Sequence, residues 1–151
     1  MKILFVDDKP VTHAYYRDEL KKSPKYRNCE IELAFDLSDA IDILNEELSQ
    51  IDAVVIDLHL PDSDIPSELK PYHQQFGREM QLNEGQLLGL YLKKKGKPYF
   101  YLSAYDKYKE EWEKTEEWKK TPDPKPKLPI CLDKEVSAEE FINVLSELLG
   151  I

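Results

Sequence analysis

Short, mostly apolar runs occur five times along the chain, and each is typical of a β-strand. They are residues 2–6, 31–35, 51–56, 99–102 and 130–132. The run at 31–35 alternates apolar with polar positions, as in a half-buried strand, whereas 51–56 is nearly unbroken and rich in β-branched residues. Because such a run suits a strand that is covered on both faces, we expect 51–56 to be the central strand of a parallel sheet.

Between these runs, apolar residues recur at the spacing of an α-helix. The helical segments are 11–22, 37–48, 87–92 and 137–149. The predicted caps are Asp36 or Ser38 for the second helix, Gly96 and Gly150 at helix ends, and a capping box of Ser137 with Glu140. Strands that alternate with helices predict an α/β fold, in which right-handed crossovers place helices on both faces of a parallel sheet.

Two segments do not fit this simple alternation. Residues 62–83 are polar and contain two prolines, which predicts a long loop with at most one short helical turn. Residues 105–120 form a charged stretch with an aromatic face of Tyr105, Tyr108 and Trp112, followed by a proline-rich stop. We expect that face to pack on the sheet, with a docking surface as the alternative.

Composition narrows the class of protein. The chain has 151 residues, of which 41% are hydrophobic, and this suits one domain spanning 1–151. Its net charge of -9 disfavours binding to nucleic acid or to anionic membranes. Cys29 and Cys131 lack metal-ligand spacing and indicate reduced thiols. Without a signal peptide or a membrane-spanning run, we expect a cytoplasmic location.

Polar residues lie at the carboxyl ends of four of the predicted strands. They are Asp7 with Asp8, then Asp57, Ser103 and Lys134. Because the carboxyl ends of parallel strands lie along one edge of the sheet, these side chains should meet there, and three carboxylates would repel one another unless a cation intervened. Mg²⁺ prefers carboxylates together with phosphate oxygens. The pattern therefore indicates a site for phosphoryl transfer.

The segments that carry these residues are FVDD at 5–8, IDLHLP at 56–61, LSA at 102–104 and LDK at 132–134. Together they resemble the receiver domain of bacterial two-component response regulators, in the right order and over nearly the whole chain. The resemblance implies a flavodoxin-like, doubly wound sheet of five parallel strands in the order 2-1-3-4-5. It also implies a single receiver domain with insertions at about 62–83 and 105–129.

The resemblance further implies a role for each residue. Asp57 would be the phosphoacceptor, Ser103 would hydrogen-bond a phosphoryl oxygen, and Lys134 would pair with another. Mg²⁺ would be held by the carboxylates of Asp7, Asp8 and Asp57 and by the backbone carbonyl of His59. The implied partners are a histidine kinase or a histidine phosphotransfer protein, together with a downstream protein target.

The chain departs from the family pattern at several positions. Cys131 stands where receivers usually carry an aromatic switch residue, and Glu135 stands where a proline usually follows the lysine. If Gly85 is the glycine that starts the next helix, most of 62–83 is an insertion. Both insertions would border the site, where they either recognise a partner or merely decorate the fold.

Three functions follow from these observations. The leading one is a receiver without enzymatic activity beyond autophosphatase activity, which passes its signal on through protein contacts or phosphorelay. The second is a receiver-like interaction module that works without phosphorylation. The third is a Mg²⁺-dependent phosphatase with an aspartate nucleophile, but such enzymes require D-x-D after the first strand, and here Lys9 follows Asp7 and Asp8.

Overall fold

The computed structural model describes residues 1–61, 64–72, 84–104, 119–120, 122–123 and 130–151. Within them, five parallel strands form one sheet in the order β2-β1-β3-β4-β5. The strands are β1 (Lys2–Val6), β2 (Glu30–Ala34), β3 (Ala53–Ile56), β4 (Tyr99–Ser103) and β5 (Cys131–Asp133). The predicted α/β class and strand order are therefore confirmed.

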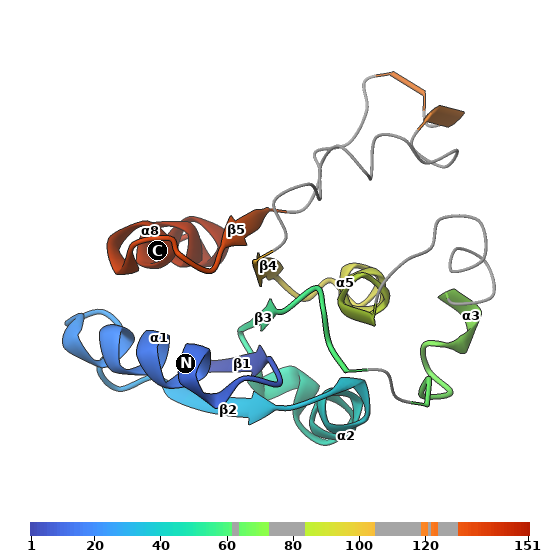
Figure 1. The fold of residues 1–151 in the computed structure, drawn as a ribbon, viewed down its shortest axis with the longest axis horizontal. Coiled ribbons are helices and arrows are strands. Elements are labelled where there is room, and N and C mark those ends of the chain that lie inside the picture. Colours follow the sequence, from blue (N-terminus) through green and yellow to red (C-terminus); the bar gives the residue numbers. More distant parts are fainter. Residues whose placement is uncertain (62–63, 73–83, 105–118, 121, 124–129) are drawn as a thin grey trace.

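Helices cover both faces of the sheet (Figure 1). Helices α1 (Pro10–Lys22) and α8 (Ala138–Leu149) lie on one face, and α2 (Leu37–Glu47) and α5 (Glu84–Lys94) lie on the other. Two short turns complete the described elements, η1 (Leu48–Gln50) and α3 (Lys70–Tyr72). The second of these agrees with the expected short helical turn in the polar segment.

The core is divided by the sheet into two apolar layers. On β1, Ile3 and Phe5 pack with the α1 and α8 side, while Leu4 and Val6 pack with the α2 and α5 side. Every residue of β3 is buried, as expected for the central strand. This burial on both faces fixes the carboxyl end of β3, from which Asp57 projects.

The helix caps are those predicted from the sequence, and the structure decides between the two candidate caps of α2. Asp36, and not Ser38, is the N-cap of α2, because its side chain accepts a hydrogen bond from the Asp39 amide at 2.9 Å. Ser137 caps α8 by accepting from the Glu140 amide at 3.2 Å. Gly150 ends the same helix in the left-handed region, with φ of 68°.

Some predicted boundaries were wrong by one or two residues. The second strand spans Glu30–Ala34. Phe35 is exposed, because the chain leaves the strand there and the Phe35 amide donates a hydrogen bond to the Asp39 carboxylate. The third strand starts at Ala53, since the preceding Asp52 carboxylate accepts a hydrogen bond from the Lys2 amide. The fifth strand is shifted one residue towards Asp133.

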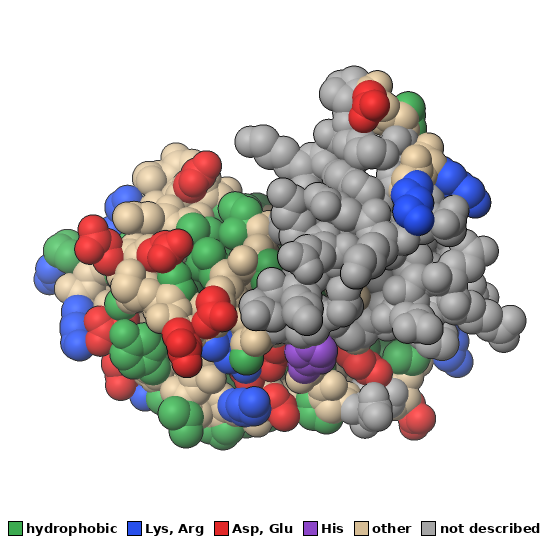
Figure 2. Space-filling model, turned by 45° about the horizontal axis from the view of Figure 1, so that its top comes forward, with side chains coloured by type: hydrophobic (Ala, Val, Ile, Leu, Met, Phe, Trp, Pro, Cys, Tyr) green, Lys and Arg blue, Asp and Glu red, His purple; other side chains and the backbone are tan. Residues whose placement is uncertain are grey.

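Other expectations fall on parts of the chain that are not described. The aromatic face of Tyr105, Tyr108 and Trp112 lies outside the described residues, as do most of the insertions at 62–83 and 105–129. On the face shown in Figure 2, acidic side chains are spread among the described lysines and arginines. None of the described helices is long and apolar enough to cross a membrane.

Candidate functional site

The carboxyl ends of β1 and β3 bring three carboxylates together. The Asp57 amide donates to the Val6 carbonyl at 2.8 Å, which sets the two strand ends side by side. Carboxylate oxygens of Asp7, Asp8 and Asp57 lie within 4.8 Å of one another. Asp7 and Asp57 are buried, whereas Asp8 is exposed. The predicted acidic cluster is therefore present, with one open side.

Lys134 lies between the two buried carboxylates. Its Nζ is 2.9 Å from Oδ2 of Asp57 and 3.2 Å from Oδ2 of Asp7. Burial alone would lower the pKa of Lys134, but the hydrogen bond to Asp57 and the charges of both carboxylates outweigh it and raise that pKa. The lysine therefore stays protonated and offsets part of the buried negative charge.

Burial has the opposite effect on the neighbouring acid. It raises the pKa of Asp7, even though the amide of Lys9 and the charge of Lys134 both favour the ionised form. Asp7 therefore lies in a position where negative charge is incompletely compensated by the described residues. A cation near Asp7 would relieve this imbalance.

Two backbone amides orient the buried carboxylates. The Lys9 amide donates to Oδ1 of Asp7 at 2.8 Å, and the His59 amide donates to Oδ1 of Asp57 at 3.1 Å. In each case the donor lies two residues after the acid, as in an Asx turn. Both carboxylates thereby turn Oδ2 towards Lys134. An aspartate at a strand end commonly starts such a turn, because its side chain bonds its own backbone.

A backbone hydrogen bond holds Ser103 beside Lys134. It is buried at the end of β4, and its carbonyl accepts a hydrogen bond from the Lys134 amide at 3.2 Å. The parallel register pairs Ser103 with Asp133, the residue before the lysine. The structure thus brings Ser103 to the same edge of the sheet as the three carboxylates.

Gly85 lies in the first turn of α5 and touches the backbone that carries the central acid. A Cβ on Gly85 would lie 2.3 Å from the Asp57 carbonyl oxygen and 2.8 Å from the Leu58 Cα. The Gly85 amide also donates to the Leu58 carbonyl at 3.4 Å. Only glycine allows the helix to approach the backbone of Asp57 and Leu58 this closely. The role of Gly85 in positioning Asp57 was not anticipated from the sequence.

Cys131, on β5, packs against the α2 and α5 layer opposite Tyr101. Burial raises the pKa of its thiol to about 11, with added repulsion from Asp133 and Asp57. The thiol is therefore neutral near pH 7. Cys29 and Cys131 are both free.

The donor set suits a hard divalent cation. Asp7, Asp8 and Asp57 each offer a carboxylate oxygen as a ligand, and backbone amides hold the carboxylates of Asp7 and Asp57 in place. Mg²⁺ prefers a few carboxylates and keeps several water molecules, which the exposed side at Asp8 would admit. The residues present therefore fit Mg²⁺.

Comparison with solved structures identifies the fold. No protein-family model and no curated protein matches this sequence. The N-terminal domain of a response regulator/sensory box/GGDEF protein from Carboxydothermus hydrogenoformans is 14% identical, with a TM-score of 0.65. The non-phosphorylated HemR receiver domain from Leptospira biflexa is 20% identical, with a TM-score of 0.62.

A third similar structure is the signal receiver domain of an HD domain-containing protein from Pseudomonas fluorescens Pf-5, at 20% identity and a TM-score of 0.59. Each of these three comparisons covers 99% of this chain and 94% of the other. The chain therefore has the fold of response-regulator receiver domains.

Proposed function

We propose that this chain is a receiver that accepts a phosphoryl group from a phosphohistidine onto Asp57 in the presence of Mg²⁺. The observation that carries the proposal is the buried lysine between two buried carboxylates, 2.9 Å from Asp57 and 3.2 Å from Asp7. A structural ion pair needs only one carboxylate. The second carboxylate, together with exposed Asp8, supplies an oxygen cluster that Asp57 shares.

In the reaction, a carboxylate oxygen of Asp57 forms a bond to phosphorus while the bond from phosphorus to the donor imidazole nitrogen breaks. The electron pair of that bond returns to the imidazole. The His59 amide holds Oδ1 and thereby fixes the direction of the carboxylate. Mg²⁺, when bound by Asp7, Asp8, Asp57 and the His59 carbonyl, would neutralise charge on the transferred group.

The acyl phosphate adds negative charge at a buried position. Lys134 already carries a raised pKa there and would exchange its contact with Asp57 for one with a phosphoryl oxygen. The Ser103 hydroxyl would hydrogen-bond another phosphoryl oxygen from the end of β4. Ser103 ends β4 and Lys134 directly follows β5, so both groups lie at the edge of the sheet before the phosphoryl group arrives.

The partners follow from the chemistry of the donor. We infer that a histidine kinase or a histidine phosphotransfer protein supplies the phosphoryl group, and that a downstream protein or a further relay step receives the signal. The single domain 1–151, with its insertions, acts in the cytoplasm without enzymatic activity other than autophosphatase activity. The net charge of -9 favours protein partners over nucleic acid.

The second candidate is an interaction module that works without phosphorylation. It is favoured by Cys131, which provides no aromatic ring on β5 to couple the site to the surface. On this alternative, replacement of Asp57 would leave partner binding and biological activity unchanged. The phosphatase alternative has no comparable support, because Lys9 occupies the position where an acid would be needed.

The test is phosphorylation by acetyl phosphate, followed by intact mass. We expect a mass increase of one phosphoryl group that requires Mg²⁺ and is lost in Asp57→Asn. The matched control is Asp42→Asn, which removes an exposed carboxylate from α2 and should be labelled like the wild type. No adduct, while a known receiver is labelled in parallel, would favour the phosphorylation-independent module. Rapid turnover of a generic phosphomonoester would favour a phosphatase.

A further inference from the structure

The outer side of β2 is a sheet edge that no described strand covers. The Glu30 amide donates to the Met1 carbonyl, and the Ala34 carbonyl accepts from the Asp7 amide. In a parallel sheet, every second residue of a strand forms its backbone hydrogen bonds with the same neighbouring strand. Since Glu30 and Ala34 bond towards β1, Ile31 and Leu33 direct their N–H and C=O groups away from it. These groups form a template onto which another strand can pair.

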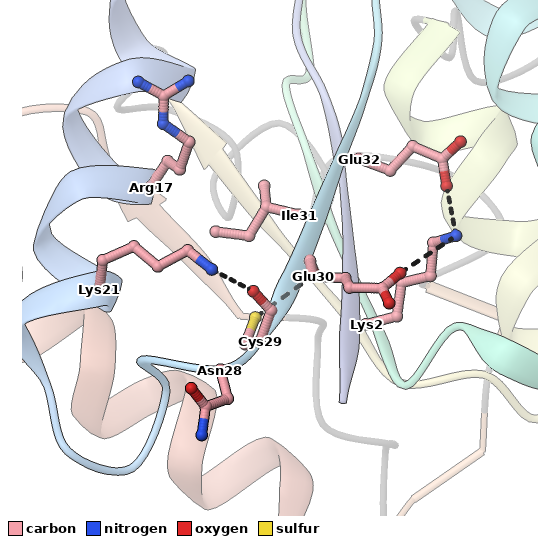
Figure 3. Close-up of a pocket in the computed structure, with 8 residues that line it drawn as sticks. All are labelled: Lys2, Arg17, Lys21, Asn28, Cys29, Glu30, Ile31 and Glu32. Atoms are coloured by element: carbon pink, nitrogen blue, oxygen red, sulfur yellow. Dashed lines mark hydrogen bonds and ion pairs between the residues drawn. The ribbon is translucent and has the colours of Figure 1, made fainter.

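A groove of about 450 Å³ lies along this edge, between α1 and β2 (Figure 3). Ile31 forms part of its lining and faces the α1 side, where it packs against the apolar layer of α1 and α8. The open edge is therefore accompanied by space for side chains of a bound segment.

The α1 side of the groove is basic. Arg17 and Lys21 lie one turn apart on α1, and both line the groove. The Nζ of Lys21 donates a hydrogen bond to the Cys29 carbonyl (Figure 3). This bond holds the positive charge of Lys21 beside the groove. Arg17 pairs with its exposed neighbour Asp18 and keeps 45% of its side-chain surface in solvent. A segment bound here would gain from acidic side chains on this side.

The other side of the groove is acidic. Glu30 and Glu32 point to the α2 side of β2, where Lys2 lies 3.8 Å from Glu30 and 2.9 Å from Glu32. Lys2 also pairs with Glu47 of α2, at 2.6 Å, so three carboxylates share the charge of one lysine. This side therefore keeps a net negative charge and favours basic side chains in a bound segment.

From this arrangement we infer that the β2 edge binds an extended segment of a partner protein, which adds as a sixth strand. Side chains of a strand alternate between its two faces. The bound segment would therefore carry acidic residues facing Arg17 and Lys21, alternating with basic residues facing Glu30 and Glu32. Main-chain hydrogen bonds would supply affinity, and the two charged faces would supply specificity and register.

Charge argues against a second copy of this chain as the occupant. If two copies paired antiparallel about Ile31, Glu30 of one would face Glu32 of the other on the same side of the sheet. Like charges directly opposite one another destabilise such a pair. The inferred surface is also independent of the proposed phosphorylation, because it uses no residue of the acidic cluster.

The test uses the full chain and two synthetic peptides of about eight residues, enough to cover a strand of this length. One peptide alternates glutamate with lysine; the other has the same composition in pairs of like residues, which puts both charges on both faces. By titration calorimetry, we expect the alternating peptide to bind about tenfold more tightly. Methylation of alternate backbone nitrogens that face β2 should abolish its binding.

The protein variants locate the site. Arg17→Glu combined with Lys21→Glu should weaken the alternating peptide at least about tenfold. The matched control Arg27→Glu changes an exposed charge nearby that does not line the groove, and should retain most of the affinity. Circular dichroism of each variant verifies folding.

Four results would overturn the inference. The first three are equal binding of the two peptides, binding that survives backbone methylation, and equal losses of affinity in the double variant and the Arg27 control. A concentration-dependent dimer that the double variant abolishes would also overturn it, in favour of a second copy.

Discussion

Gly85 lies directly against the backbone of Asp57, so that a Cβ on the glycine would be 2.3 Å from the aspartate carbonyl oxygen. Helix α5 thus touches the chain directly after β3, at the residue that carries the proposed chemistry. The neighbouring atoms belong to the backbone of Asp57 and Leu58, two buried residues directly after β3, so they cannot move aside as a flexible side chain would.

Replacement of this glycine tests the contact. Helix propensity alone predicts that Gly85→Ala stabilises the protein by about 0.5–1 kcal/mol. We expect the opposite sign, a loss of about 1–3 kcal/mol in the free energy of unfolding, because the methyl group must displace backbone. Urea denaturation followed by circular dichroism measures the change. An alanine variant as stable as the wild type would show that α5 does not approach β3 this closely.

A second close approach connects α5 to β4. A Cβ on Gly89 would lie 2.0 Å from the Tyr101 hydroxyl oxygen and 3.0 Å from the Tyr101 Cζ. We expect Gly89→Ala to destabilise the protein, and Tyr101→Phe to relieve part of that loss by removing the nearest atom. In a double-mutant cycle, the cost of Gly89→Ala should be at least about 1 kcal/mol smaller in the phenylalanine background. Additive costs would contradict the contact.

The gathering of Asp7, Asp57 and Lys134 was predictable because parallel strands place their carboxyl ends along one edge, whatever the details of packing. The contact of Gly85 with Asp57 was not, since it depends on the depth at which α5 docks on the sheet. The exposure of Phe35 was missed for a related reason. Its position continues the alternation of β2, but the cap of α2 turns the chain one residue earlier.

Magnesium should stabilise the folded protein through the acidic cluster. Binding to the native state alone adds about 2.7 kcal/mol at a hundredfold excess over the dissociation constant. We expect thermal unfolding to shift upwards with Mg²⁺ in the wild type and to lose most of this response in Asp8→Asn. Asp8 is exposed, so its replacement should not destabilise the metal-free protein.

The control for this experiment is Asp42→Asn, which removes an exposed carboxylate far from the cluster in sequence and should retain the full response. If Mg²⁺ raised the unfolding temperature equally in Asp8→Asn and Asp42→Asn, the ion would bind at a site other than the acidic cluster. Differential scanning fluorimetry over a range of Mg²⁺ concentrations provides the measurement, and a monovalent salt at equal ionic strength separates binding from screening.

His13 should make stability depend on pH. Its ring packs edge-on against Phe5, with centroids 5.6 Å apart, and its buried Nε2 has no hydrogen-bond partner among the described residues. Burial lowers the pKa of His13, and the charge of Arg17 lowers it further. The unfolded chain, with an ordinary histidine pKa of about 6.5, then binds the proton more readily than the folded protein.

The sign follows from this difference. The contribution of His13 to stability is fully present above about pH 6.5, the pKa of the unfolded chain, and is lost as the pH falls from there through the lower pKa of the folded protein. In His13→Leu, the free energy of unfolding should therefore fall less than in the wild type between about pH 7.5 and pH 5. Buried Asp7 titrates in both proteins, so the difference between the two curves isolates His13. Urea denaturation at each pH measures it, and parallel curves would show that the His13 ring is not held in the neutral form.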